Sequence, residues 1–215
     1  MDSSGVLQAR SARGAIMKPD DMSAWISWAL YATAGLAQEG DALMREHGES
    51  VRRFAHKLAR VFPVERRATY RGVLLESWRV PEHGVLSPRE SDTYSSWTED
   101  KLVARWFADP AGFLARVVLD YAPDVVGWLA TRAAPEPGEI LYHHTWASAF
   151  PVPLWTLARE HPAMAHAADE VEWNMRTQQE VILMPTSYAV ERHEVDTDTS
   201  EALNARLTAP WVRQS

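Results

Sequence analysis

The stretch MRTQQEVILMP, Met175 to Pro185, places two glutamines and a glutamate directly before a run of apolar residues. Its second half, EVILMP, has the length and composition of a buried strand that ends at a proline. A carboxylate at the head of a buried strand costs several kcal/mol of folding free energy unless it is paired. Because side chains alternate along a strand, we expect Gln178 and Glu180 on one face, about 6 to 7 Å apart, and Gln179 on the other. The stretch therefore predicts an amide and a carboxylate side by side at the mouth of a buried strand.

Short strand-like runs fill the chain after Pro63, and turn residues separate them. Runs rich in Val, Ile, Tyr, Phe and Trp that are bounded by Gly, Pro, Asn or Asp are typical of strands. Such runs predict strands over residues 68–78, 113–121, 139–146, 180–185 and 187–195. The intervening sequence contains the loop RAAPEPGE and predicts helices over residues 99–107, 124–132 and 153–160.

The chain before Pro63 shows a helical pattern from Met22 to about Phe62. One apolar stripe follows the i, i+3, i+4, i+7 spacing and consists of Val51, Phe54, Ala55, Leu58 and Val61. The opposite face is basic, with Arg52, Arg53, His56, Lys57 and Arg60. This basic face can bind a phosphate-bearing partner or an acidic protein surface, and the alternative is a solvated helix face. Helices first and short strands afterwards indicate the α+β class.

These patterns divide the chain into a flexible tail at residues 1–19, a helical segment at 20–64 and a strand-rich core at 65–215. The apolar run at residues 22–38 lacks charged residues but is too short for a membrane span of about 20 residues. A signal peptide is an alternative interpretation, because basic residues lie upstream, at Arg10, Arg13 and Lys18. Asp20 and Asp21 directly before the run favour instead a buried helix, capped by Asp21 or Ser23.

The composition of the 215 residues is that of an ordinary globular protein, with 46% hydrophobic and 24% charged residues. The net charge of -7 argues against nonspecific nucleic-acid binding, which depends on Lys and Arg. The absence of cysteine excludes disulfides and thiolate metal sites. His143 and His144 are adjacent in a predicted strand and should point to opposite faces, so we expect no metal site there.

Two further groups of polar residues accompany the predicted strands. Arg71 lies within the apolar run TYRGVLL, and a buried arginine usually has an anionic partner such as phosphate. Gly72 follows it and lets a ligand approach the backbone. In YSSWTEDKLVARWFA, Ser96 and Thr98 share one strand face directly before a helix. Each group also has an ordinary interpretation: a charge at a strand edge for Arg71, a helix cap for the hydroxyls, and surface exposure for Glu180.

In their order along the chain, these groups form a family pattern. The pattern is an aromatic-Arg-Gly strand, an aromatic-x-Ser-x-Ser/Thr segment leading into an Ala-x-x-Phe helix, and Gln-x-Glu before an apolar strand. Its positions here are Tyr70, Arg71, Gly72, Tyr94, Ser96, Thr98, Ala104, Phe107, Gln178 and Glu180. From Ala68 to about Val195 the chain thereby resembles the Arg-Ser-Glu class of mono-ADP-ribosyltransferases, in the style of its toxin-like and bacteriophage members. The resemblance implies an α+β fold with a split β-sandwich, an N-terminal helical segment, and a catalytic core at residues 65–215.

The resemblance also implies a binding site for NAD, which would be the substrate, without a metal. Arg71 would bind the phosphate and the nicotinamide ribose, and the Gly72 backbone would hold the nicotinamide carboxamide. Ser96 would orient Glu180, and Thr98 would support the same strand. Glu180 would be the catalytic glutamate, which binds the ribose 2′-hydroxyl and stabilises the cation that forms as nicotinamide leaves.

Target selection is assigned by the same resemblance to residues around the Gln-x-Glu motif. Gln178 would position the acceptor nucleophile. Family members that modify arginine carry a glutamate at this position, so the glutamine disfavours an arginine target. Trp173 lies where a target-recognition turn is expected, and the alternative for it is a place in the core.

The implied function is transfer of ADP-ribose to a macromolecule by a soluble protein that acts in the cytoplasm of a host bacterial cell. The target would be a protein, and nucleic acid stays open as an alternative. Two other interpretations are an NAD glycohydrolase on the same fold, with water as acceptor, and a catalytically silent protein that binds a partner.

Overall fold

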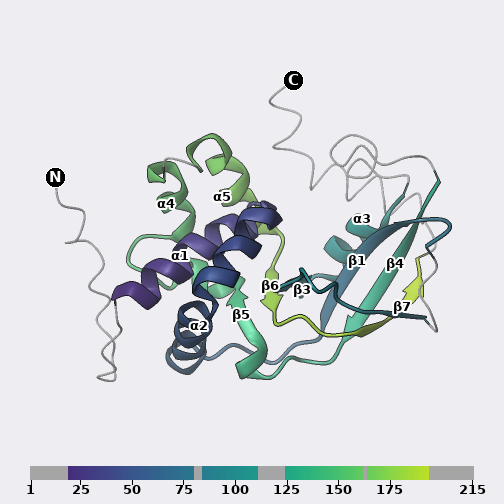
Figure 1. Ribbon diagram of the computed structural model, residues 1–215, viewed down its shortest axis with the longest axis horizontal. Helices are drawn as coiled ribbons and strands as arrows, with labels where there is room; N and C mark the ends of the chain where they lie inside the picture. Colours follow the sequence, from purple (N-terminus) through teal and green to yellow (C-terminus); the bar gives the residue numbers. More distant parts are fainter. Residues whose placement is uncertain (1–18, 80–83, 111–123, 162–163, 194–215) are drawn as a thin grey trace. The chain divides into compact units, whose positions relative to one another are not determined.

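The computed structural model describes residues 19–79, 84–110, 124–161 and 164–193 (Figure 1). The chain forms two compact units. Unit 1 comprises the described parts of residues 1–65 and 136–176, and unit 2 comprises those of residues 66–135 and 177–215. The tail was predicted at residues 1–19; residues 1–18 and the predicted strand at 113–121 lie outside the described residues, and Pro19 is the first residue of a helix.

Unit 1 begins with two helices, α1 (Pro19–Thr33) and α2 (Ala37–Val61), which confirm the helical prediction for this segment. The break between them lies at Gly35, whose φ of 74° is a conformation that residues with a side chain rarely adopt. The amide groups of Gly35 and Leu36 donate to carbonyl groups in the last turn of α1, so they satisfy acceptors that the helix leaves open. Among the described helices, none is long and apolar enough to cross a membrane.

Residues 136–176 belong to unit 1, whereas the sequence pattern grouped them with the strand-rich core. Their described part contains β5 (Ile140–His143), α4 (Leu154–Glu160), α5 (Ala168–Thr177) except for its last residue, and 3₁₀ turns at 137–139, 144–148 and 165–167. The buried ring of Trp25 in α1 contacts the rings of Tyr142, Trp146 and Phe150. Its Nε1 donates a 2.8 Å hydrogen bond to the carbonyl of Leu141. Aromatic packing from distant parts of the chain therefore builds the core of unit 1.

The predicted strand at 139–146 is shorter than expected. It ends at His143, and a 3₁₀ turn begins at His144. The imidazole of His143 accepts from the backbone amide of Thr145, which starts the turn in the manner of a helix cap. As a result, the rings of His143 and His144 stack at a centroid distance of 4.6 Å instead of pointing to opposite faces.

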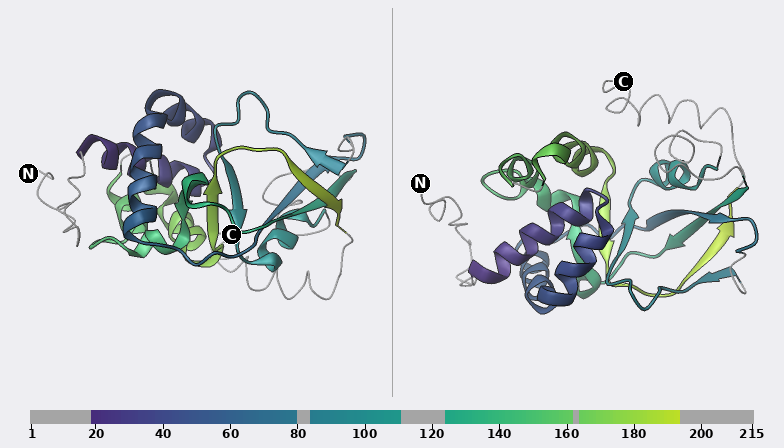
Figure 2. Two further views of the ribbon diagram at one scale, coloured as in Figure 1. Left: turned by 90° about the horizontal axis from the view of Figure 1, so that it is seen from below. Right: turned by 45° about the horizontal axis from the view of Figure 1, so that its top comes forward.

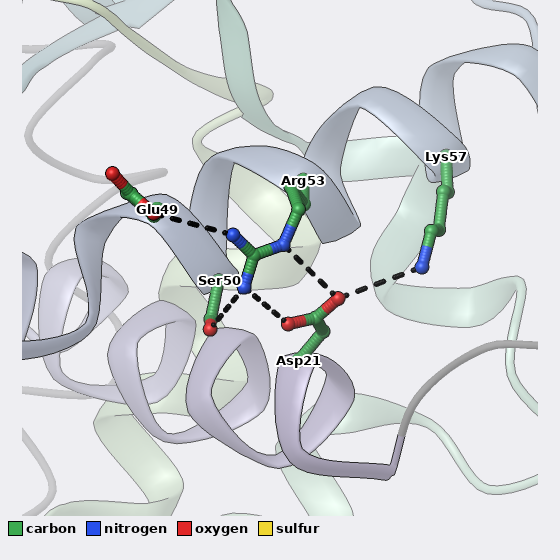
Figure 3. A network of polar contacts seen from close by, with 5 residues as sticks. All are labelled: Asp21, Glu49, Ser50, Arg53 and Lys57. Carbon is green, nitrogen blue, oxygen red and sulfur yellow. Dashed lines mark hydrogen bonds and ion pairs between the residues drawn. The ribbon is translucent and has the colours of Figure 1, made fainter.

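A buried acid ties the two N-terminal helices together (Figure 3). Asp21 in α1 is 2% exposed, and its carboxylate lies 3.0 Å from Nη2 of Arg53 and 3.5 Å from Nζ of Lys57, both in α2. The hydrogen bond from Arg53 lowers the pKa of Asp21. Two of the five residues on the basic face are thus engaged inside unit 1, while Arg52, His56 and Arg60 are exposed.

Unit 2 contains an antiparallel sheet, which confirms the α+β class. Its strands lie in the order β2-β7-β4-β1-β3-β6. They are β1 (Thr69–Glu76), β2 (Val85–Leu86), β3 (Ser95–Thr98), β4 (Val125–Arg132), β6 (Glu180–Leu183) and β7 (Tyr188–Arg192). The predicted strands at 68–78, 180–185 and 187–195 are confirmed with shorter bounds. The helix predicted at 99–107 is confirmed as α3 (Lys101–Ala108), which begins two residues later and ends one residue later, and the helix predicted at 153–160 is confirmed as α4.

The predicted helix at 124–132 is wrong, because this segment forms β4. The strand pairs along its whole length with β1, from Thr69 opposite Arg132 to Glu76 opposite Val125. Two adjacent β-branched residues and a glycine weaken its helix propensity, and the long partner strand supplies hydrogen bonds to the full run. A contact between distant segments therefore decides the conformation.

Helix α3 packs across β1 and β4, as Figures 1 and 2 show. The close approach depends on two glycines, one in each strand. A Cβ atom at Gly72 would overlap the carbonyl oxygen of Ala104, and a Cβ atom at Gly127 would overlap that of Ala108. The backbone of α3 thus lies directly on the sheet, beside the residues that form the pocket described below.

Candidate functional site

A pocket of about 230 Å³ lies in unit 2 and is built from segments that are far apart in the sequence. Strand β1, strand β3 with α3, and the start of β6 each contribute side chains. The lining residues are Tyr70, Arg71, Gly72, Ser96, Trp97, Thr98, Val103, Ala104, Phe107, Gln178 and Glu180. The pocket thus brings together Arg71, Gly72, Ser96, Thr98, Gln178 and Glu180, which the sequence singled out.

Glu180 is the buried acid of the pocket. It is the first residue of β6, pairs with Thr98 of β3 and is 7% exposed. Its Oε2 atom is buried and makes no hydrogen bond to the described residues. Burial raises the pKa of this carboxyl to about 7, against the opposing effects of a hydrogen bond from Ser96 and the positive charge of Arg71. The pocket therefore contains a carboxyl group that changes charge near neutral pH and has one unused oxygen.

A turn, and not an alternating strand, places Gln178 beside Glu180. Helix α5 ends at Thr177 and β6 begins at Glu180, so the expectation that both residues share a strand face was wrong. Gln179 between them has a φ of 46°, in the left-handed region that few residues other than glycine adopt. Because α5 ends only three residues before β6 begins, the turn between them sets the position of Gln178 relative to Glu180.

The turn is held by β3. Oγ1 of Thr98 donates a 2.6 Å hydrogen bond to the carbonyl of Gln178, and the amide of Glu99 donates to the carbonyl of Gln179 at 3.2 Å. Thr98 also accepts from the amide of Asp100 at 3.0 Å. Because Asp100 is the residue that caps α3, by accepting from the amide of Leu102, the hydroxyl of Thr98 is available to fix the turn.

Arg71 is half-buried and spans from β1 to β3. Its Nη1 donates a 3.0 Å hydrogen bond to the carbonyl of Ser96. Its guanidinium carbon lies 5.7 Å from the ring centroid of Tyr188, which is a cation–π distance. An arginine carries several N–H donors, so these contacts leave others for an anionic ligand.

Gly72 lines the pocket, and the structure supplies a packing reason for the glycine. The side on which a Cβ atom would lie is filled by the backbone of α3, at Ala104 and Ala108. The lack of a side chain is therefore required by the helix, whatever the backbone of Gly72 binds.

Trp173 does not lie in a turn, so that part of the sequence interpretation was wrong. It lies inside α5, belongs to unit 1 and is half-buried. Helix α5 was not predicted, because its sequence ADEVEWNMRT has few apolar residues with which to mark a stripe.

One residue beside the pocket, Tyr188, was not among the site residues predicted from the sequence. Tyr188 begins β7, and its ring is flanked by Arg71 and by Trp97, whose ring lies edge-on at 5.0 Å. The only signal for it was an aromatic residue at the start of a predicted strand.

Comparisons of the chain with protein-family models, with curated proteins and with solved structures found no match.

Proposed function

We propose that this protein is an NAD-dependent mono-ADP-ribosyltransferase, with unit 2 forming the sheet of an ADP-ribosyltransferase-like split β-sandwich. The main support is the buried carboxyl of Glu180, which retains an unpartnered oxygen in a pocket that also contains Arg71. A buried polar atom without a partner is costly, and a ligand or a reaction that supplies the partner is one explanation for it. The order of the Arg, Ser/Thr and Gln-x-Glu motifs along the chain agrees with this proposal.

In the proposed reaction, the bond between the nicotinamide nitrogen and C1′ of the ribose breaks, and nicotinamide leaves with the electron pair. The ribose becomes cationic at C1′, and the ionised carboxylate of Glu180 stabilises this charge. The 2′-hydroxyl donates a hydrogen bond to Glu180, which gives Oε2 the partner that it lacks. An acceptor then forms a bond to C1′ and releases its proton. Because these contacts strengthen as charge develops, they favour the transition state over the bound substrate.

The size of the pocket agrees with a partial enclosure of the dinucleotide. Its volume of about 230 Å³ is below the range of roughly 300–1,000 Å³ that encloses most drug-sized ligands. We therefore place the nicotinamide and its ribose inside, with the diphosphate at Arg71 and the adenosine outside. Gln178, at the turn before Glu180, holds the acceptor, and its neutral amide disfavours an arginine target.

The experiment that tests this function measures nicotinamide release from NAD by the purified protein, with and without cell lysate. We expect release that lysate increases, with label from NAD on a macromolecule. Glu180→Ala and Glu180→Gln should each lower the rate by about a hundredfold or more. Glu191→Gln is the matched control, because Glu191 is an exposed glutamate on β7 and should leave the rate unchanged.

Three outcomes contradict the transferase. Release without transfer of label would identify a glycohydrolase, with water as acceptor. Equal rates for the wild type and Glu180→Gln would remove Glu180 from the mechanism. A folded wild-type protein that neither binds nor cleaves NAD would indicate a binding protein without this activity.

A further inference from the structure

Tyr188 contacts Arg71, which lines the pocket, from a strand that pairs with neither β1 nor β3. Strand β7 lies next to β2 and β4, and Tyr188 itself pairs with Leu86. The connection from β6 to β7 crosses from one side of β3 and β1 in the strand order to the other. This crossing delivers the tyrosine ring to the guanidinium of Arg71, at a distance of 5.7 Å from the ring centroid.

Arg71 is held from two directions. On one side Nη1 donates to the carbonyl of Ser96 at 3.0 Å. On the other side it lies over the ring of Tyr188 and makes a hydrogen bond with the tyrosine side chain. The ring of Tyr188 is itself fixed edge-on against Trp97, whose Nε1 donates to Ser95 at 3.0 Å. A long, flexible arginine side chain is thereby held in one arrangement, which lowers the entropy that a ligand must otherwise remove.

We propose that Tyr188 is a positioning residue that holds the guanidinium of Arg71 in the pocket. Its effect on NAD binding rests on the proposed function. Its effect on the pKa of Glu180 does not rest on that function, because the charge of Arg71 lowers this pKa in the protein without NAD.

The effect of Tyr188 on Arg71 can be measured through the pKa of Glu180, because the charge of Arg71 acts on this carboxyl. Arg71 of β1 is the cation whose charge lowers the pKa of Glu180. Lys101 of α3 is exposed and lies 5.8 Å from the ring centroid of Tyr70, at the pocket lining. Burial raises the pKa of Tyr188, and the negative charge of Asp92 raises it further. If Tyr188 no longer holds Arg71, the guanidinium moves in solvent, its charge is screened, and the pKa of Glu180 rises above about 7.

The test is an NMR titration of the Glu180 carboxyl carbon in the full chain, combined with nicotinamide-release kinetics. Two variants are compared with the wild type. Tyr188→Phe retains the ring and removes the hydroxyl, and Tyr188→Leu removes both. We expect the Glu180 midpoint to rise in the order wild type, Phe variant, Leu variant. We also expect KM for NAD to rise about threefold in the Phe variant and about tenfold or more in the Leu variant, with kcat changed less. Glu191→Gln should leave both quantities unchanged.

The two readouts separate the failure of this proposal from the failure of the proposed function. If the wild type releases no nicotinamide, the function is wrong, and the NMR midpoints still test the role of Tyr188. If the folded Phe variant has the wild-type midpoint, the proposal is overturned. The same conclusion follows if the Leu variant shows a wild-type midpoint. Should the Leu variant fail to fold, the Phe variant alone decides, because it retains the packing of the ring.

Discussion

Oγ1 of Thr98 donates a 2.6 Å hydrogen bond to the carbonyl of Gln178, across 80 positions of sequence. The bond attaches β3 to the turn that precedes the buried acid Glu180. Because Gln179 in this turn has a left-handed φ of 46°, the turn depends on external contacts to keep its shape. The position of the acid therefore depends on a side chain of the neighbouring strand.

Removing this bond should loosen the turn. We expect Thr98→Val, which retains the shape and removes the hydroxyl, to lower the unfolding free energy by about 1 kcal/mol, because the half-buried carbonyl of Gln178 loses this donor. Nicotinamide release should fall as well. Urea denaturation measures the first effect, and Thr98→Ser is the control that should retain most of both properties. A Val variant as stable and as active as the wild type would show that the bond does not hold the turn.

The pKa of Glu180 predicts a pH-dependent stability. The folded-state pKa of about 7 lies above the ordinary value of 4.5, so the unfolded chain loses its proton first as the pH rises. The unfolding free energy should therefore fall between pH 4.5 and about 7, by about 3 kcal/mol, and then level off. Glu180→Gln should be close to the wild type at pH 4 and more stable than it at pH 8.

Denaturant unfolding of both proteins across this pH range provides the measurement. Glu191→Gln is the control, because its exposed side chain should give a curve parallel to that of the wild type. A constant difference between Glu180→Gln and the wild type at all pH values would contradict the raised pKa.

The same carboxyl should determine the pH dependence of the proposed reaction. Only the ionised form of Glu180 stabilises a cation, so kcat/KM for nicotinamide release should rise about tenfold per pH unit below about 7 and level off above it. The hydrogen bond from Ser96 lowers the pKa of Glu180. Ser96→Ala should therefore move the midpoint of the profile to higher pH. A profile without a midpoint near neutral pH, or a midpoint that Ser96→Ala moves downward, would argue against Glu180 as the group that ionises.

The packing of α3 on the sheet predicts that the loss of stability caused by a Gly→Ala substitution depends strongly on which glycine is replaced. Gly72→Ala should lower the unfolding free energy by about 1 to 3 kcal/mol or more, because its Cβ atom would overlap the backbone of Ala104 and force α3 away from β1. Gly138→Ala is the matched control, because a Cβ atom there would contact nothing within 4 Å. Thermal denaturation distinguishes the two variants. Equal stability of both would mean that α3 adjusts without cost.

The sequence predicted correctly those elements whose apolar residues show a recognisable local pattern. The apolar stripe of α2 has the period of a helix, and the runs TYRGVLL in β1 and EVIL in β6 are short apolar runs of strand length, so their type was predicted correctly. Arg71 and Glu180, the charged residues of these apolar runs, indicated the pocket, because burying a charge is costly unless a partner or a ligand compensates it.

What the sequence by itself determined was the helical N-terminal segment, the α+β class and the set of polar residues that line the pocket. Only the tertiary structure decided that residues 125–132 form a strand, because β1 supplies the hydrogen bonds, and that Gly72 must lack a side chain, because α3 lies on it. It also decided that a turn held by Thr98 presents Gln178, and that Tyr188 lies against Arg71. These features depend on which distant segments meet, and they leave no period in the local sequence.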